Sequence, residues 1–172
     1  MKLAYLIVTG TTTAPLALEL VNGLVARFAE VITLATPHAA RVIAPRDLSS
    51  VPGNRLVESY FDAAILPRPP DGLVLVAPCS FNSLNKLAWG IADNLAMSLA
   101  AEAIGRGTPV LVAVSLNPPL FRHPRCAEAM AALRSWGVSV IEPRDTGSGL
   151  RLAPTQAILE EVERRASAYD HV

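Results

Sequence analysis

The stretch LVLVAPCSFNSLNKLAWGIADNL, residues 73–95, decides the fold of this chain. Its first five residues, Leu73–Ala77, are all apolar, which is too short for a helix and suits a strand buried on both faces, as in a parallel sheet. Pro78 has no N–H to donate, so we expect it to end the ladder of the strand. From Leu84 onward, apolar residues recur at helical spacing. A buried strand therefore ends in a polar turn at the start of a helix, where ligands bind in open α/β sheets.

The turn itself, residues 78–83, is rich in residues that cap helices, namely Ser80, Asn82 and Ser83. Taken alone, it also fits a well-capped connection that binds nothing. The remaining strand ends of the chain decide between these two interpretations.

Strand and helix patterns alternate along the whole chain. The sequence predicts strands over residues 3–8, 30–36, 55–60, 73–77, 109–114 and 138–141, and helices over 15–28, 39–43, 84–104, 125–136 and 154–169. Residues 45–53 and 143–149 read as loops. We therefore predict one α/β domain over residues 1–172, a Rossmann-like (flavodoxin-like) parallel sheet with helices on both faces.

Composition narrows the class of function. Hydrophobic residues make up 51% of the chain and charged residues 17%, so subunit burial is plausible. The formal net charge is zero, which gives no electrostatic reason to expect a nucleic acid or a membrane surface as partner. No apolar run is long enough for a membrane span. The two cysteines, Cys79 and Cys126, show no metal-ligand spacing, so we expect a cytoplasmic protein with free thiols and no metal.

The first predicted strand ends in Gly10, Thr11 and Thr12, just before a helix. Free N–H groups and the helix dipole make such a terminus a site for anions. The second and third glycines of a dinucleotide fingerprint are absent, and so is the Gly-Lys-Ser/Thr ending of a P-loop. A single phosphate is the better fit, and an ordinary capped helix remains the alternative. Thr36 and His38, and later Ser115 and Asn117, supply polar groups at two further strand ends.

Two motifs resemble those of the flavin-containing cysteine decarboxylases. The family pattern Pro-Ala-Ser-Ala-Asn-Thr, followed by Asn-Gly-x-x-Asp-Asn-Leu, is matched here by Pro78, Cys79, Ser80, Phe81, Asn82, Ser83 and then Trp89, Gly90, Asp93, Asn94 and Leu95. The family pattern Pro-x-Met-Asn-x-x-Met-Trp is matched more loosely by residues 114–121, with His123 and Pro124 retained. The resemblance extends over nearly the whole chain.

The resemblance implies an FMN cofactor and an assembly of trimers or dodecamers, with Trp89 as a candidate contact residue unless it is a core residue. It assigns cofactor binding to Gly10, Thr11, Thr12, Thr36, His38, Pro78, Ser80 and Ser98. For His38, a residue that merely starts a surface helix is an equal alternative. The resemblance also implies that Asn82 and Asn117 bind the substrate carboxylate.

The implied reaction is oxidative decarboxylation of the C-terminal cysteine of a precursor peptide, as in lantibiotic-type biosynthesis. The cysteine loses a hydride equivalent to the flavin, and the resulting thioaldehyde loses CO2 to leave an aminoenethiol. Residues 143–154 would close over the peptide, with Gly147 and Gly149 as hinges or as plain turn glycines.

Two departures from the family pattern matter. The active-site His of the family falls at Ala64, so an acid or base at that position is missing. The reducing Cys of the phosphopantothenoyl enzymes is absent from residues 143–154, which disfavours the coenzyme A role. An FMN-binding protein without decarboxylase activity, in a regulatory or accessory role, therefore remains an alternative. A prenyl-flavin transferase shares the fold but fits the 78–95 motif less well.

Overall fold

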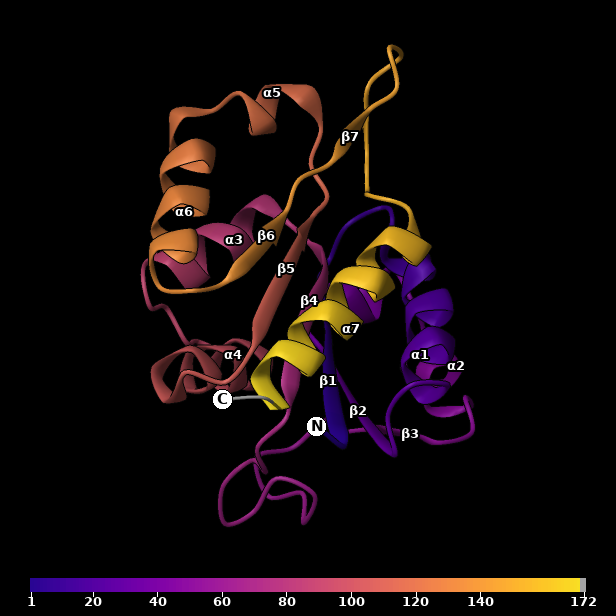
Figure 1. The fold of residues 1–172 in the computed structure, drawn as a ribbon. Helices are drawn as coiled ribbons and strands as arrows, with labels where there is room; N and C mark the ends of the chain where they lie inside the picture. Colours follow the sequence, from indigo (N-terminus) through magenta and orange to yellow (C-terminus); the bar gives the residue numbers. More distant parts are fainter. Residues whose placement is uncertain (171–172) are drawn as a thin grey trace.

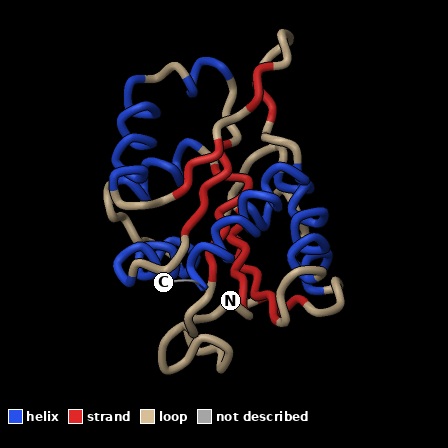
Figure 2. The backbone as a smooth tube through the Cα atoms, in the orientation of Figure 1, coloured by secondary structure: helices blue, strands red, loops and turns tan. Residues whose placement is uncertain are grey.

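A six-stranded parallel sheet forms the centre of the protein in this computed structural model, which describes residues 1–170 (Figure 1, Figure 2). The strands are β1 (Leu3–Val8), β2 (Glu30–Ala35), β3 (Asn54–Leu56), β4 (Leu73–Cys79), β5 (Val110–Val114) and β6 (Ser139–Ile141). Their order is β3-β2-β1-β4-β5-β6, with every pair parallel. This order places the topological switch point between β1 and β4, and confirms the predicted fold class.

Helices cover both faces of the sheet (Figure 1). One face carries α3 (Phe81–Ala88), α4 (Leu95–Arg106) and α6 (Pro124–Ser135). The opposite face carries η1 (Ala14–Leu16), α1 (Ala17–Val25), α2 (Pro45–Ser49) and α7 (Thr155–Asp170). Two short elements, η2 (Ala39–Arg41) and α5 (Pro118–Phe121), follow the ends of β2 and β5.

Alternate residues of each central strand enter the two halves of the core. In β1, Tyr5 and Ile7 belong to the α3–α4–α6 half, whereas Leu6 and Val8 belong to the other half. Every residue of β1, β4 and β5 is buried. A strand that is apolar along its whole length is what a doubly covered parallel sheet requires.

Pro78 does not end β4, contrary to the sequence-based expectation. The strand continues to Cys79, which pairs with Val114 of β5 after a register shift that begins at Val76. This irregularity lets the ladder pass the residue that has no N–H. The carbonyl of Pro78 instead accepts hydrogen bonds from Thr9 of the neighbouring strand end.

The single helix predicted over residues 84–104 is in fact two helices. Gly90 has a φ of 67°, which breaks the helix after α3. Asn94 then caps α4 by accepting a hydrogen bond from the Met97 N–H. Because of this break, Trp89 and Ile91 are exposed instead of lying in the core.

Two segments predicted as loops contain regular structure. Residues 45–49 form α2, which begins at Pro45 because proline suits the first turn of a helix. Residues 144–151 form an antiparallel hairpin of β7 (Arg144–Asp145) and β8 (Leu150–Arg151). Its tip contains Gly147 and Gly149 at φ values of 76° and 142°, which only glycine adopts readily. Within residues 1–170, no helix is long and apolar enough to cross a membrane.

Candidate functional site

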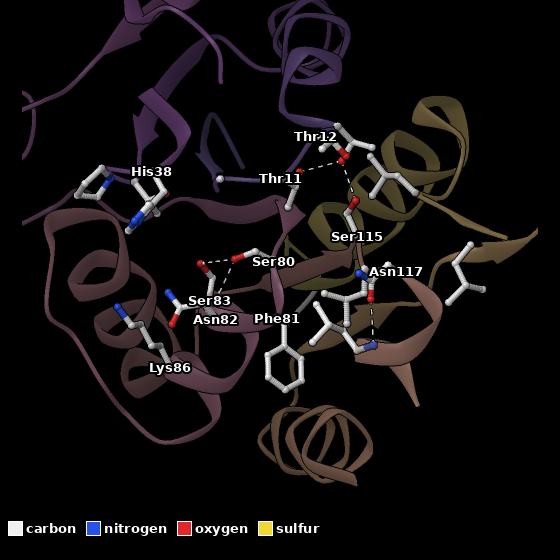
Figure 3. A pocket seen from close by; sticks show the side chains of 18 of the residues that line it. Thr11, Thr12, His38, Ser80, Phe81, Asn82, Ser83, Lys86, Ser115 and Asn117 are labelled. Atoms are coloured by element: carbon white, nitrogen blue, oxygen red, sulfur yellow. Dashed lines mark hydrogen bonds between the residues drawn. The ribbon is translucent and has the colours of Figure 1, made fainter. Parts of the chain in front are cut away.

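A cavity of about 900 Å³ lies beyond the carboxyl ends of β1, β2, β4 and β5 (Figure 3). Four strand-end segments line it: residues 10–13, 36–38, 80–83 and 115–117. Residues 93–94, between α3 and α4, and residues 150–152 of the hairpin region complete the wall. The polar strand ends recognised in the sequence therefore converge on one site at the switch point.

Thr9 joins the two strands on either side of that switch point. Its hydroxyl donates to the Pro78 carbonyl at 2.7 Å and accepts from the Ser80 N–H at 2.8 Å. Thr9 is fully buried, so these bonds satisfy its side chain where water does not reach. These hydrogen bonds fix the position of the loop after β1 relative to the turn after β4.

A chain of hydroxyl groups joins the β1 loop to the end of β5. Thr13 Oγ1 lies 2.8 Å from Thr11 Oγ1 and 2.7 Å from Ser115 Oγ (Figure 3). The Ser115 N–H in turn donates to the Cys79 carbonyl at 2.9 Å. This part of the cavity is uncharged and rich in hydrogen-bonding groups, which suits a polar ligand.

Gly10 and His38 bring the β1 and β2 loops into close contact. A Cβ atom at position 10 would lie 2.6 Å from the Cβ and 2.9 Å from the carbonyl carbon of His38. Real atoms do not approach so closely, so this position requires glycine. His38 lines the cavity and immediately precedes η2, so its position allows either role that the sequence suggests, a contact to a phosphate or the start of a surface helix.

Ser80, not Asn82, caps α3. The Ser80 hydroxyl accepts from the Ser83 N–H at 3.2 Å, and the helix begins at Phe81. Asn82 is exposed in the first turn and lines the cavity, and its side chain makes no hydrogen bond with any of residues 1–170. The explanation of Asn82 as a helix cap is therefore wrong, and its amide is available to a ligand (Figure 3).

Asn117 has two functions available to it. Its side-chain oxygen accepts from the Leu120 N–H at 3.0 Å and caps α5. The capping bond uses the oxygen and leaves both amide hydrogens for another partner. Asn117 lines the cavity from the β5 side (Figure 3).

An ion pair marks the end of the cavity near α4. Lys86 Nζ lies 2.5 Å from Asp93 Oδ2, and the Asn94 side-chain amide donates to Asp93 Oδ1 at 3.0 Å. The hydrogen bond from Lys86 lowers the pKa of the Asp93 carboxyl below its ordinary value. The pair joins the end of α3 to the start of α4 and fixes the turn between them.

Eight of the ten residues assigned from the sequence line this one cavity: Gly10, Thr11, Thr12, Thr36, His38, Ser80, Asn82 and Asn117. Pro78 does not line it, because it lies inside β4. Ser98 does not line it either. Its hydroxyl donates to the Ala92 carbonyl and lies 3.0 Å from the Tyr60 hydroxyl. The Ser98 side chain therefore contacts the segment that contains Tyr60.

Several cavity residues were not assigned from the sequence. Those with polar or charged side chains are Thr13, Ser83, Lys86, Asp93, Asn94, Ser115 and Arg151. Thr13 and Ser115 continue polar strand ends that had been recognised, so they were within reach of the same reasoning. Arg151 was not, because its placement depends on where β8 returns from the hairpin tip to the cavity wall.

Ala64, at the position of the family His, is not part of the cavity. It is partly buried against the core on the α4 face, and its N–H donates to Asp62 Oδ1 at 2.8 Å. Asp62 in turn pairs with Arg55. Of residues 58–72, none lines the cavity of the same chain.

Both cysteines are buried. Burial raises the pKa of the Cys79 thiol, and to a lesser degree that of Cys126. A thiol with a raised pKa forms little thiolate at neutral pH and is a poor nucleophile. Neither cysteine lines the cavity. Among residues 1–170, no group of three or more His, Cys, Asp or Glu is arranged to hold a metal ion.

Comparisons with known proteins show which family the chain belongs to. The coenzyme A biosynthesis bifunctional protein CoaBC of Thermococcus kodakarensis is 26% identical over 170 residues, 95% of this chain and 42% of that protein. The chain therefore spans less than half the length of this curated relative.

Two solved structures share the fold. A peptidyl-cysteine decarboxylase, EpiD, superposes with a TM-score of 0.76 at 21% identity, covering 93% of this chain and 98% of its own. An FMN-dependent cysteine decarboxylase from thioviridamide biosynthesis, TvaF, gives 0.78 at 18% identity, covering 97% and 99%. At these identities the likeness establishes the fold.

The sequence model named Flavoprotein matches residues 2–167, nearly the whole chain. This match confirms at family level the resemblance drawn from the 78–95 motif, and with it the expectation of a flavin. The chain belongs to the flavoprotein family.

Proposed function

We propose that this protein is an FMN-dependent decarboxylase that oxidatively decarboxylates the C-terminal cysteine of a peptide to an aminoenethiol. The observation that supports it most is the convergence of four polar strand ends on one cavity, with the Asn82 amide unpaired inside it. Membership of the flavoprotein family and the decarboxylase names of EpiD and TvaF point the same way.

The cavity fits FMN better than a dinucleotide. Its β1 loop has the single tight glycine, Gly10, where backbone must approach backbone. The residues at the start of α3 and the hydroxyl groups of Thr11, Thr12 and Thr13 line the same cavity, and that combination suits one phosphate and a polyhydroxyl chain. We assign this role to Gly10, Thr11, Thr12, Thr36 and Ser80, with His38 beside them. When bound, FMN supplies the two-electron oxidation that the reaction needs.

Asn82 and Asn117 are suited to hold the carboxylate that is lost. They lie on two neighbouring strand ends, after β4 and β5, and both present amide hydrogens to the cavity. During decarboxylation the carboxylate gives up its negative charge and becomes neutral CO2. A neutral amide orients the group without stabilising its charged ground state as strongly as a cation would. Neutral donors are therefore better placed here than Lys or Arg.

The hairpin region supplies an apolar cover. Leu150 and Leu152 line the cavity from this segment, and Leu152 is buried. We propose that these side chains exclude water from the bound cysteine. Gly147 and Gly149 lie at the hairpin tip, away from the cavity wall, where they serve the turn.

The absence of a cysteine from the hairpin region favours a peptide substrate over the coenzyme A precursor. Residues 143–154 contain no cysteine, so nothing there returns electrons to an enethiol product. An enzyme whose product remains an enethiol needs no such residue. The relationship to CoaBC keeps phosphopantothenoylcysteine as the comparison substrate in the test.

The test is a mass measurement on protein reconstituted with FMN. Incubation with a Cys-terminated peptide should lower the peptide mass by about 46 Da, the sum of CO2 and two hydrogens. Phosphopantothenoylcysteine in a parallel reaction should be consumed more slowly. Faster consumption of phosphopantothenoylcysteine would overturn the peptide assignment.

A second candidate function follows from Ala64. If the missing His is indispensable, the protein binds FMN but acts as a regulatory or accessory flavoprotein. In the same experiment, it would hold FMN while the masses of both substrates stay constant. An Ala64→His variant that gained turnover would then identify the missing group.

A further inference from the structure

The hairpin β7–β8 carries two arginines directly opposite each other. The antiparallel register pairs Arg144 with Arg151, so their side chains project from the same face of the ribbon. Like charges directly opposite each other on two strands are destabilising. Within residues 1–170, neither arginine forms an ion pair or a hydrogen bond through its side chain. The hairpin thus presents two positive charges that nothing in the described chain neutralises.

This charged hairpin stands at the entrance of the cavity. Figure 1 shows it projecting from the body of the protein beyond the carboxyl ends of the strands. Arg151 lines the cavity next to Leu150 and Leu152. The Lys86 ammonium on the wall is paired with Asp93, whereas the Arg151 guanidinium has no ion pair within residues 1–170. The positive charge available to a ligand is therefore concentrated on the hairpin side.

We propose that Arg144 and Arg151 form an anion subsite that selects peptides with an acidic side chain upstream of the terminal cysteine. The inference rests on the proposed function. The acidic group is not the carboxylate that is lost, because a guanidinium bound there would stabilise the charged ground state and slow its loss. The proposed function assigns the terminal cysteine to Asn82 and Asn117, at the ends of β4 and β5, so the hairpin on another side of the cavity meets an earlier residue of the peptide. A planar guanidinium binds a carboxylate through two parallel hydrogen bonds, and a neighbouring arginine adds long-range attraction.

Binding to non-reactive peptides tests the subsite without turnover. The protein is loaded with FMN and titrated against fluorescent peptides that end in Ser in place of Cys. Each peptide carries either Asp or Asn at one of the four positions before the terminal residue. Fluorescence anisotropy gives Kd for each peptide. At one position the Asp peptide should bind about three- to tenfold more tightly than the Asn peptide. High salt should remove the difference, because the group is at the surface.

Three variants assign the effect to the hairpin. Arg151→Gln should abolish the preference for Asp, and Arg144→Gln should reduce it. Both variants relieve a like-charge contact, so we expect them to fold. Arg46→Gln is the matched control, since Arg46 is 89% exposed on α2 and does not line the cavity. It removes the same charge and should leave every Kd unchanged.

Two outcomes would overturn the subsite. One is equal binding of the Asp and Asn peptides at all positions, and the other is a preference that survives in the Arg144→Gln/Arg151→Gln double variant. A phosphopantothenoylserine competitor supplies a phosphate as the alternative anion. In one outcome, this competitor displaces the peptides from the wild-type protein and not from the double variant, while the Asp and Asn peptides bind equally well. That result would show that the subsite binds a phosphate, and the acidic-peptide assignment would be wrong.

The proposed function is scored separately from the subsite. The preferred Asp peptide is resynthesised with its terminal Cys and its mass is followed. Tight binding with no loss of mass would refute the decarboxylase activity and leave the subsite standing. Loss of mass together with equal binding of the Asp and Asn peptides would support the decarboxylase activity and refute the subsite.

Discussion

Replacing Asn82 with Ala separates a ligand-binding role from a structural one. The Asn82 side chain is exposed in the cavity and bonds to none of residues 1–170, so its removal breaks no contact that stabilises the fold. We expect the free energy of unfolding to change by less than about 0.5 kcal/mol. If the amide holds the substrate carboxylate, losing that hydrogen bond removes roughly 1.5–3 kcal/mol of binding to a charged group. Turnover of a Cys-terminated peptide should then fall about ten- to a hundredfold.

Ser80→Ala is the matched variant, two residues earlier. Ser80 does cap α3, through the 3.2 Å bond from the Ser83 N–H. Its removal should cost about 1 kcal/mol of stability. For a chain of this length that lowers Tm by about 2–4 °C. Both melts are measured on flavin-free protein, because a bound ligand would itself shift Tm.

The assay measures flavin absorbance and peptide mass on the FMN-loaded protein, and Tm on a flavin-free portion of the same preparation. Asn82→Ala should keep its flavin and its Tm and lose most of the mass change of about 46 Da. A destabilised Asn82→Ala protein with full turnover would refute the reasoning, since it would show that Asn82 supports the fold and does not touch the substrate. Full stability together with full turnover would also remove Asn82 from the site.

Three further predictions concern the cofactor and the assembly. The flavin released from the purified protein should run as FMN on chromatography, and a peak at the position of FAD would contradict the single-phosphate site. Gly10→Ala should weaken FMN binding by at least about tenfold, because its Cβ would lie 2.6 Å from His38 Cβ. Gly105→Ala, in α4 with nothing within 4 Å, serves as the control and should bind FMN normally. The protein should be a trimer or a multiple of trimers by light scattering, since Phe61 and Trp89 are 87% and 63% exposed. A monomer at micromolar concentration would rule this out.

The centre of the sheet was predictable because β1, β4 and β5 are fully buried. A run such as Leu73–Ala77 has no polar face, so only a strand covered on both sides accommodates it. The helix break at Gly90 was harder to predict. Apolar residues on both sides keep helical spacing, and nothing local shows that Ile91 turns outward. The β4 end was also misjudged, because the register shift that accommodates Pro78 is a property of two strands together.

The cavity was predictable in outline for a related reason. Polar residues such as Thr36 and Ser80 follow buried strands, and parallel topology alone brings the ends of those strands to one edge. The chain contains no local signal for Thr9, whose partners are 69 and 71 residues away. The same holds for Arg151, which reaches the cavity only because β8 leads back from the hairpin tip to the cavity wall.

Asn82 shows how sequence and geometry together decide a role. From the sequence, an Asn between two serines before a helix is as good a cap as either neighbour. Only one residue occupies the capping position, and the bond from the Ser83 N–H gives it to Ser80. Asn82 then follows in the first turn with its amide directed into the cavity and no bond to the described chain (Figure 3). A polar side chain that contributes nothing to its own helix, in the wall of a switch-point cavity, is one whose partner comes from outside the fold.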